Sequence, residues 1–359
     1  MDIPNNFIPK ETKPQQGKAT WASPSNIALV KYWGKYGNQM PQNPSLSFTL
    51  SKCQTTTTVT FTPNQQKSKT VDFTFLFEGK SQLDFHPKIQ TFFERIADFC
   101  PYVFDHAWTI ESSNSFPHSS GIASSASSMS ALALGILSLE KQAHPHLSQD
   151  NFNQKASFLA RLGSGSAARS ICGPMMAWGK SKAIPGSAQE WALPINDKLD
   201  AVFHSYQDTI LIIDKGQKKV SSSLGHRLMK DHPYAQNRFE QAHRHTERLM
   251  GVMAQGELDD FIELVELEAL TLHALMMASN PYFILMQPQT LQVINLIWAY
   301  REATKHPLCF TLDAGANVHL LYPKEYQKQI KTLIDSELSC LCQDGQYIED
   351  QVGKGAKKM

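Results

Sequence analysis

A run of small residues from Pro117 to Ser128 is the part of the chain best suited to holding a phosphate group. Its sequence, PHSSGIASSASS, leads directly into an apolar segment at residues 129–139. Glycine and serine let a backbone approach a ligand closely, and the first N–H groups of a helix lack intrahelical partners, so an anion is favoured there. The run lacks the GxxxxGKS/T spacing of a P-loop. Taken alone, it could equally be a low-complexity linker before a core helix.

Two lysines, Lys31 and Lys35, stand four residues apart with Tyr32 and Trp33 between them. Lys31 follows an apolar run, and a buried ammonium is retained only where it pairs with an anion. This spacing therefore indicates an anion site. Two surface lysines beside a core tryptophan are the alternative.

Two further segments carry groups that could contact a ligand. The sequence RLGSGSAAR at residues 161–169 combines hydroxyl groups, glycine-exposed N–H groups and guanidinium groups, which suit phosphate or carboxylate oxygens. Asp313 is a lone carboxylate beside Gly315 at the end of an expected strand, where a ligand can approach. A turn with a capping serine and a turn-forming aspartate are the alternatives for these two segments.

The elements that position these groups can be predicted from hydrophobic periodicity. Strands are predicted at residues 55–62, 71–75, 209–214, 308–312 and 317–322. Helices are predicted at residues 89–99, 129–139, 155–162, 239–253 and 258–275. The first two strands flank a turn at Pro63 and Asn64 and have the composition of an antiparallel sheet, and the last two form a hairpin around Asp313.

Strands precede helices in each half of the chain, which predicts an α+β protein of two lobes. A length of 359 residues suits about two domains. We expect a flexible N-terminal segment at 1–20, an N-terminal domain with the phosphate loop at 21–190, a C-terminal domain at 191–345 and a tail at 346–359. Residues 354–359 are expected to be frayed.

Composition excludes several classes of function. With 34 Lys and Arg against 33 Asp and Glu, the charges nearly cancel, so an electrostatic nucleic-acid binder is not expected. No apolar run is long enough to span a membrane, and the polar N-terminus lacks the apolar core of a secretory signal, which together indicate a cytoplasmic protein. Six scattered cysteines indicate reduced thiols. The histidine and cysteine pairs lack metal-ligand spacing, so no metal site made of protein ligands is expected.

The four segments together resemble one family. The serine-rich loop is similar to the phosphate loop of the GHMP kinases, while residues 26–35, 161–169 and 313–315 resemble the diphosphomevalonate decarboxylases in particular. The resemblance extends from about Trp21 to Tyr322 in the family's order, and its most specific patterns are KYWGK and GSGSAxR. It implies a GHMP-kinase-like fold with mixed or antiparallel sheets, helices packed on them, an active site in the cleft between lobes, and a homodimer.

The reaction implied by this resemblance is the ATP-dependent decarboxylation of mevalonate 5-diphosphate to isopentenyl diphosphate in isoprenoid biosynthesis, with release of ADP, phosphate and carbon dioxide. A tertiary hydroxyl is a poor leaving group, so it must first become a phosphate ester. The family's chemistry therefore requires ATP, with Mg²⁺ bound to the nucleotide.

The same resemblance implies roles for individual residues. Asp313 would orient or deprotonate the 3-hydroxyl, Lys31 would tune its charge, and Arg169 would bind the substrate carboxylate or diphosphate. Ser222 would lie near the transferred phosphate, with the register among three consecutive serines left open. The remaining substrate ligands would be Tyr32, Lys35, Ser164, Ser166 and Lys88. The ATP ligands would be Ser119, Ser120, Gly121, Ala123, Ser124 and Ser125. His273 would pack in the core or behind the site.

Three departures from the family pattern leave alternatives open. His118 to Ser120 stand where small apolar residues or threonine are common, Ala316 where proline is frequent, and Lys88 where an arginine is expected. Because lysine cannot make the forked contact of arginine, the substrate could be a monophosphate or an unphosphorylated relative. A mevalonate-type 3-kinase, a phosphomevalonate decarboxylase and a non-catalytic nucleotide or metabolite sensor are the other hypotheses.

Overall fold

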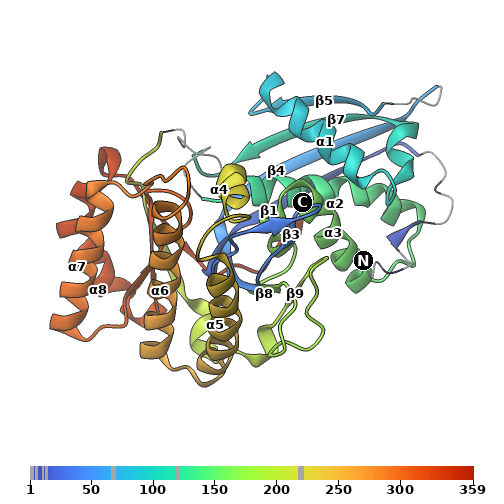
Figure 1. Cartoon of the computed structure of the whole chain (residues 1–359). Helices are drawn as coiled ribbons and strands as arrows, with labels where there is room; N and C mark the ends of the chain where they lie inside the picture. The colour runs from blue at the N-terminus through green and yellow to red at the C-terminus, as the bar shows by residue number, and fades with distance from the viewer. Residues whose placement is uncertain are drawn as a thin grey trace.

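Two β-sheets and the helices packed on them form two lobes (Figure 1). The computed structural model describes residues 4, 7–9, 12, 15–65, 70–117, 122–216 and 222–359. The predicted α+β class and the two-lobed arrangement are confirmed. In the described part of the chain, no helix is long and apolar enough to cross a membrane.

The first lobe is built on an eight-stranded sheet in the order β14-β1-β4-β7-β5-β6, with β8 joining β4 to β9. Its strands are β1 (Gly17–Val30), β4 (Ser45–Pro63), β5 (Asp72–Phe77), β6 (Lys80–Ser81), β7 (His106–Asn114), β8 (Met175–Trp178), β9 (Ala192–Pro194) and β14 (Lys357–Lys358). Its helices are α1 (His86–Ile96), α2 (Ser124–Ala143) and α3 (Gln149–Gly163). A short hairpin of β2 (Lys35–Tyr36) and β3 (Met40–Pro41) projects from the end of β1.

The threonine-rich half of β4 explains how this sheet is covered. From Cys53 to Phe61 every second residue is buried and the intervening residues are half-buried, as expected for a sheet with helices on one face. The helix α2 lies on this face and is buried almost all round. It approaches closely because Gly135 has no side chain: a Cβ atom there would lie 2.4 Å from Cγ2 of Val59. The close approach fixes the distance between α2 and the sheet.

The second lobe has a four-stranded antiparallel sheet in the order β11-β12-β10-β13. Its strands are β10 (Gln207–Leu211), β11 (Cys309–Thr311), β12 (Val318–Tyr322) and β13 (Tyr347–Gln351). Its helices are α4 (Ser222–Leu228), α5 (Ala235–Gln255), α6 (Leu258–Met277), α7 (Pro288–Thr304) and α8 (Gln327–Leu333).

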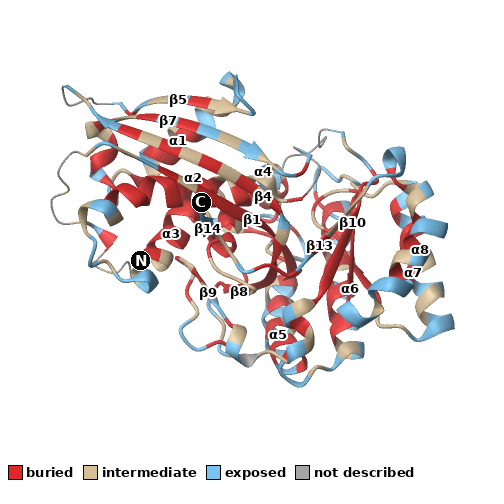
Figure 2. Cartoon of the chain, turned by 180° about the vertical axis from the view of Figure 1, so that it is seen from behind, coloured by how far each residue is buried: buried red, intermediate tan, exposed pale blue. Residues whose placement is uncertain are grey.

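One hydrophobic core joins the lobes. Apolar side chains from the end of β1 and the start of β4 pack with side chains from β10, α5 and α6. Figure 2 shows this continuity as buried residues along β1 and β4 that face those of β10 and α6. Burial on both sides explains why β4 is fully buried from Ser45 to Leu50 before its alternation begins.

Most predicted elements are present. The helices predicted at 89–99, 129–139 and 155–162 correspond to α1, α2 and α3, and those in the second half correspond to α5 and α6. The predicted hairpin around Asp313 is the antiparallel pair of β11 and β12. All six cysteines are free thiols, as expected.

Three expectations at the edges of the first sheet are wrong. The strand predicted at 71–75 is β5, and it is not antiparallel to its long neighbour. It runs parallel to β7, which lies between it and β4, because the α1 crossover returns the chain to the same end of the sheet. Residues 17–20, assigned to the flexible segment, belong to β1. The tail expected to be frayed is ordered, since β14 pairs with Trp21 and Ala22.

We predict that removing residues 354–359 lowers the free energy of unfolding by about 1–3 kcal/mol. The truncation deletes the β14 pairing and the hydrogen bonds from Ala356 N–H to Ile171 O and from Met359 N–H to Thr20 O. Urea unfolding followed by circular dichroism measures the change. The control replaces the exposed side chains of Lys357 and Lys358 with alanine and keeps the backbone pairing; an equal loss in the control would contradict the prediction.

Candidate active site

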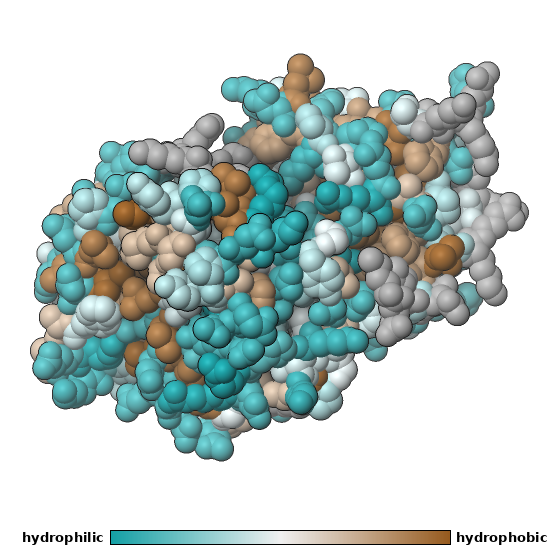
Figure 3. Space-filling model, viewed as in Figure 1, coloured by the Kyte–Doolittle hydropathy of each residue, from teal (hydrophilic) through white to brown (hydrophobic). Residues whose placement is uncertain are grey.

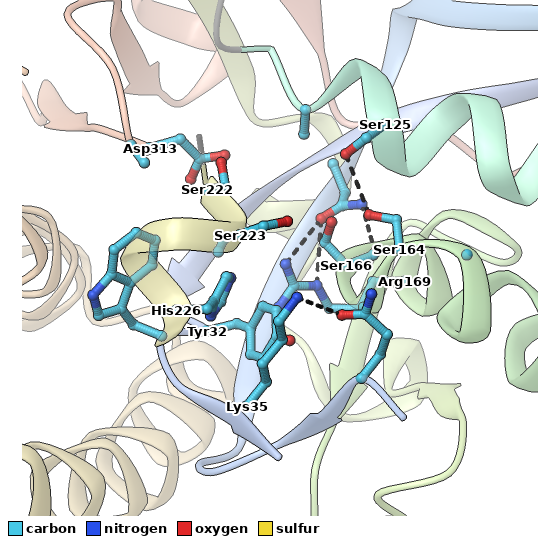
Figure 4. Close-up of a pocket in the computed structure, with 18 of the residues that line it drawn as sticks. Tyr32, Lys35, Ser125, Ser164, Ser166, Arg169, Ser222, Ser223, His226 and Asp313 are labelled. Carbon is cyan, nitrogen blue, oxygen red and sulfur yellow. Dashed lines mark hydrogen bonds between the residues drawn. The ribbon is translucent and has the colours of Figure 1, made fainter. Parts of the chain in front are cut away.

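A cavity of about 340 Å³ lies between the two lobes and collects most of the described residues that the sequence analysis singled out. Figure 4 shows Asp313 and Ser222 on one side of it, Ser125 and Arg169 on the other. The described side chains that line it include five cations and one carboxylate: Lys31, Lys35, Lys88, Arg95, Arg169 and Asp313. Such a charge balance favours a ligand with several negative charges.

Lys31 and Asp313, expected to be neighbours, form an ion pair at the centre of the cavity. The Nζ atom of Lys31 lies 3.3 Å from Oδ1 of Asp313 and donates a hydrogen bond of 2.6 Å to the carbonyl of Ala28. Lys31 is 1% exposed and Asp313 27% exposed. Burial lowers the pKa of Lys31, while Asp313 and Glu268 oppose that shift. Asp313 therefore faces the ligand space with a cation behind it.

The backbone of Lys31 is held by a buried ion pair that sequence reasoning missed. Oε2 of Glu268 accepts the Lys31 N–H at 2.8 Å, and Nη2 of Arg238 donates to the Lys31 carbonyl at 3.1 Å. The same guanidinium is bound to both oxygens of Glu268, at 2.5 and 2.7 Å, and His245 contacts Oε1 at 2.5 Å. This arrangement fixes the end of β1 against α5 and α6.

Arg169 is a buried guanidinium held by neutral groups. Its Nε and Nη2 atoms donate to Oδ1 of Asn26 at 3.3 and 3.2 Å, and Nη1 donates to Oγ of Ser45 at 2.5 Å. Among the described residues it forms no ion pair, although it is only 3% exposed. Burial lowers its pKa to about 10, and the charge of Asp313 opposes the shift. A buried cation with only neutral partners indicates a site for an anionic ligand.

Tyr32 and Lys35 line the lower part of the cavity in Figure 4. The Tyr32 hydroxyl is buried and has no hydrogen-bond partner among the described residues. Lys35 donates to Oε1 of Gln39 at 2.8 Å. The pKa of Lys35 is lowered by burial and then by three neighbouring cations, Arg95, Arg227 and Lys88. A positive potential that depresses the pKa of a lysine also attracts phosphate oxygens.

The start of α2 and the end of α3 meet at one edge of the cavity. Oγ of Ser125 lies 3.2 Å from Oγ of Ser164, and Ser166 lines the same edge. Ala123 precedes the helix in the left-handed region, with φ of 44°, and provides no side-chain hydrogen bond to the first turn. Ser119, Ser120 and Gly121 lie outside the described residues.

A smaller, apolar cavity of about 80 Å³ adjoins the start of α2. Phenylalanine and aliphatic side chains form most of its wall: Phe75, Phe77, Phe85, Ile89, Ile110, Met129 and Leu132. Ser124 lines this cavity, whereas Lys88 and Ser125 line both cavities. A flat apolar group could therefore lie here while its charged end reaches the larger cavity.

The other predicted residues take the following positions. Ser222 and Ser223 both line the larger cavity, so the register of the serine contact stays a prediction. His273 is buried and its Nε2 donates to the Asp313 carbonyl at 3.1 Å, behind the carboxylate. Arg95, which sequence reasoning missed, lines the cavity from the same helix as Lys88. Among the described residues, no group of three or more His, Cys, Asp or Glu side chains is placed to bind a metal ion.

We predict that Glu268→Gln lowers the free energy of unfolding by about 3–5 kcal/mol at pH 7, because it leaves the buried Arg238 uncompensated. Burial would raise the pKa of Glu268, but Arg238, His245 and the Lys31 N–H outweigh it and hold the pKa at about 2. The carboxylate therefore contributes stability that is fully present above pH 4.5 and is lost as the pH falls towards 2.

Urea unfolding between pH 3 and 7 tests this expectation. The variant should lose the part of the acid sensitivity that comes from Glu268. Glu263→Gln, at an exposed position on the same helix, is the matched control and should stay within about 0.5 kcal/mol of the wild type. Wild-type stability of Glu268→Gln at pH 7 would show that the Glu268–Arg238 ion pair is dispensable.

Two family models match the chain. The diphosphomevalonate decarboxylase-like N-terminal domain matches residues 23–192, and the mevalonate 5-diphosphate decarboxylase C-terminal domain matches residues 209–358. The diphosphomevalonate decarboxylase of Ganoderma lucidum is 28% identical over 340 residues, which cover 88% of this chain and 81% of the relative. The phosphomevalonate decarboxylase of Haloferax volcanii is 26% identical over 323 residues, which cover 88% of this chain and 92% of the relative.

Solved structures give the same result. The mevalonate diphosphate decarboxylase of Staphylococcus aureus has a TM-score of 0.81 at 27% identity and covers 96% of this chain and 98% of its own. The solved structure of MDDEF in complex with MVAPP, AMPPCP and magnesium has a TM-score of 0.81 at 27% identity. The match covers 96% of this chain and 99% of that one. Both halves of the chain, its fold and the motifs around its cavity thus agree, and the chain belongs to the diphosphomevalonate decarboxylase family.

Proposed function

We propose that the protein catalyses the ATP-dependent decarboxylation of mevalonate 5-diphosphate to isopentenyl diphosphate, releasing ADP, phosphate and carbon dioxide. The observation that carries this proposal is the Lys31–Asp313 pair in a cavity that also contains the buried Arg169, which forms no ion pair with any residue the structure describes. A carboxylate backed by a cation suits a hydroxyl that must be activated, and a guanidinium suits the carboxylate that leaves.

The residues around α2 fit a nucleotide. The start of this helix offers N–H groups and the Ser124 and Ser125 hydroxyls to phosphates, and its Ala123 cap leaves room for them. The apolar cavity beside it suits a nucleobase. When bound, ATP with Mg²⁺ supplies the phosphoryl group that makes the 3-hydroxyl a leaving group.

Three residues of the chain have separate roles in the proposed reaction. Asp313 accepts a hydrogen bond from the 3-hydroxyl, orients it and takes its proton. Lys31 pairs with the Asp313 carboxylate and adds positive charge beside the oxygen that is phosphorylated. Arg169 holds the substrate carboxylate, and its planar contact to Asn26 fixes the direction of that hold.

The 5-diphosphate lies at the cationic end of the cavity in this proposal. Tyr32, Lys35, Ser164 and Ser166 contact its oxygens, and the Ser222 hydroxyl lies near the transferred phosphate. Arg95 compensates for the lysine at position 88, because its guanidinium lines the same cavity and can make the forked contact that lysine cannot. This supports the diphosphate as substrate.

Decarboxylation of the monophosphate is the second candidate. Lys88 favours it, as does the similarity to the phosphomevalonate decarboxylase of Haloferax volcanii. The same residues would carry the chemistry, since the two substrates differ only in the distal phosphate. The number of cations around Lys35 favours the diphosphate.

We also propose that the protein is a cytoplasmic homodimer with a domain boundary near residue 190. The matches of the two family models, at 23–192 and 209–358, support this boundary. The expected end of the second domain at residue 345 is wrong, because β13 in the expected tail pairs with β10 of the second sheet. Exposed apolar side chains at the α6–α7 end of the molecule (Figure 3) support self-association: Met277, Tyr282, Ile284, Leu291 and Trp298. Size-exclusion chromatography with light scattering tests the dimer.

The defining experiment supplies purified protein with Mg-ATP and, separately, mevalonate, its 5-phosphate and its 5-diphosphate. Equal amounts of ADP and carbon dioxide from the diphosphate, with isopentenyl diphosphate detected by mass, would establish the proposal. The same yield from the monophosphate alone would establish the second candidate. ADP without carbon dioxide would indicate a kinase, and no ADP from any substrate would indicate a sensor.

We predict that Asp313→Asn lowers kcat by about 10²–10⁴-fold, because an amide can orient the hydroxyl but cannot accept its proton. Steady-state assays of ADP release measure the loss. Asp260→Asn, at an exposed carboxylate paired with Arg248, is the control and should retain wild-type kcat. A kcat for Asp313→Asn close to that of the control would remove Asp313 from the mechanism.

We predict that Arg95→Ala raises KM for the diphosphate by about 10- to 100-fold, the value of a charge-assisted hydrogen bond, and changes KM for the monophosphate less. Arg95→Lys should fall between wild type and alanine. The exposed Arg248→Ala is the control. If Arg95→Ala affects both substrates equally, Arg95 does not read the distal phosphate.

A further inference from the structure

His226 is a buried histidine at the edge of the cavity to which the family pattern assigned no role. It lies on α4 and is 8% exposed. Its ring packs between two aromatic rings, with centroid distances of 4.3 Å to Tyr32 and 4.7 Å to Trp33. Gly225 allows this packing, because a Cβ atom there would lie 2.4 Å from the Trp33 ring. The imidazole is therefore held in one place.

The tautomer of His226 follows from its contact with the backbone. The Gly34 N–H donates a hydrogen bond of 3.0 Å to Nδ1. A backbone N–H cannot accept, so Nδ1 carries a lone pair and the ring proton is on Nε2. Burial lowers the pKa of His226 to about 3, and the charges of Lys35 and Arg169 act in the same direction. The ring thus stays neutral, with Nε2–H as its single donor.

A second buried histidine shows what is unusual about this donor. His232 also accepts a backbone N–H at Nδ1, from Tyr234 at 3.2 Å, and its Nε2 donates to the Leu275 carbonyl at 2.9 Å. His226 likewise accepts a backbone N–H at Nδ1, but no residue that the structure describes accepts a hydrogen bond from its Nε2–H. It lines the cavity instead (Figure 4), beside Tyr32 and near Lys35. Because His226 lines the cavity, a ligand oxygen bound there is the natural acceptor for this donor.

We propose that Nε2–H of His226 donates a hydrogen bond to a phosphate oxygen of the substrate, next to Lys35 and Tyr32. This inference rests on the proposed function, because it assigns one more contact to the same anionic substrate. The groups that face the imidazole are the Tyr32 and Trp33 rings, the cations Lys35 and Arg169, and the cavity. A neutral donor adds a phosphate contact where a further positive charge would be repelled.

Two substitutions separate the donor from the acceptor. In His226→Asn the amide oxygen can still accept the Gly34 N–H, but no donor reaches the Nε2 position. In His226→Gln the amide nitrogen can take the Nε2 position, whereas the acceptor for Gly34 N–H is lost. His232→Asn is the matched control, since it alters a buried histidine of the same kind that does not line the cavity.

Calorimetric titration of mevalonate 5-diphosphate into each variant, without ATP, measures affinity apart from turnover. We expect His226→Asn to raise Kd by about 10- to 100-fold in a protein that still folds, with an unfolding temperature lowered by the loss of the ring contacts to Tyr32 and Trp33. His226→Gln should raise Kd by less than about threefold and lower the unfolding temperature, because an N–H group loses its acceptor. His232→Asn should leave Kd unchanged. A folded His226→Asn protein with wild-type Kd would overturn the inference.

Nitrogen NMR of the wild-type imidazoles gives a test that does not depend on a variant folding. We expect His226 to be a neutral Nε2–H tautomer from pH 6 to 8, with its Nε2 proton shifted by added inorganic pyrophosphate. A proton on Nδ1, an imidazolium, or an Nε2 signal that pyrophosphate leaves unmoved would overturn the inference. Because pyrophosphate binding needs no decarboxylation, this result is separate from failure of the proposed reaction in the turnover assay.

Discussion

The buried Lys31 is contacted by charged and polar groups from both lobes, and its position depends on all of them. Desolvating such a group costs several kcal/mol, which must be offset by well-placed partners. The chain supplies them from distant segments: the Ala28 carbonyl and Asp313 contact Nζ, while Glu268 and Arg238 hold the backbone. The partners come from β1, α5, α6 and the β11–β12 turn, so the position of Lys31 depends on the docking of one lobe on the other.

The cavity shows how local charge can differ from overall charge. The whole chain has a formal net charge of +1, yet the described residues that line the cavity include five cations and a single carboxylate. Burial of Arg169 against neutral partners and crowding of cations around Lys35 are both electrostatically unfavourable. Binding a polyanion relieves both, so part of the binding free energy comes from repulsion already present in the protein.

Local sequence patterns predicted what local interactions determine. The spacing of Ile89, Phe92, Phe93 and Ile96 was sufficient for α1, and the turn chemistry around Asp313 was sufficient for the β11–β12 hairpin. The segments near Lys31, Arg169 and Asp313 were identified by residue type and by resemblance, and the structure brings them to one cavity.

What the sequence could not reveal depends on contacts between distant residues. Glu268 meets the Lys31 backbone across 237 positions, and no local pattern distinguishes it from the exposed acids of the same helix. Arg95 lies on a helix whose spacing predicts only an amphipathic surface element. The tautomer of His226 is set by the hydrogen bond from the Gly34 N–H, which no local pattern around His226 indicates. The parallel pairing of β5 with β7 likewise depends on the path of the crossover.

The pairing of β14 with β1 has a consequence for synthesis on the ribosome. Proteins emerge N-terminus first, and domains tend to fold as soon as their residues are available. Here β14 follows every other described strand in the chain, yet it covers the edge of β1 in the first sheet. The first lobe therefore cannot complete that sheet until the second has been translated, and until then β1 presents unpaired backbone groups to other chains.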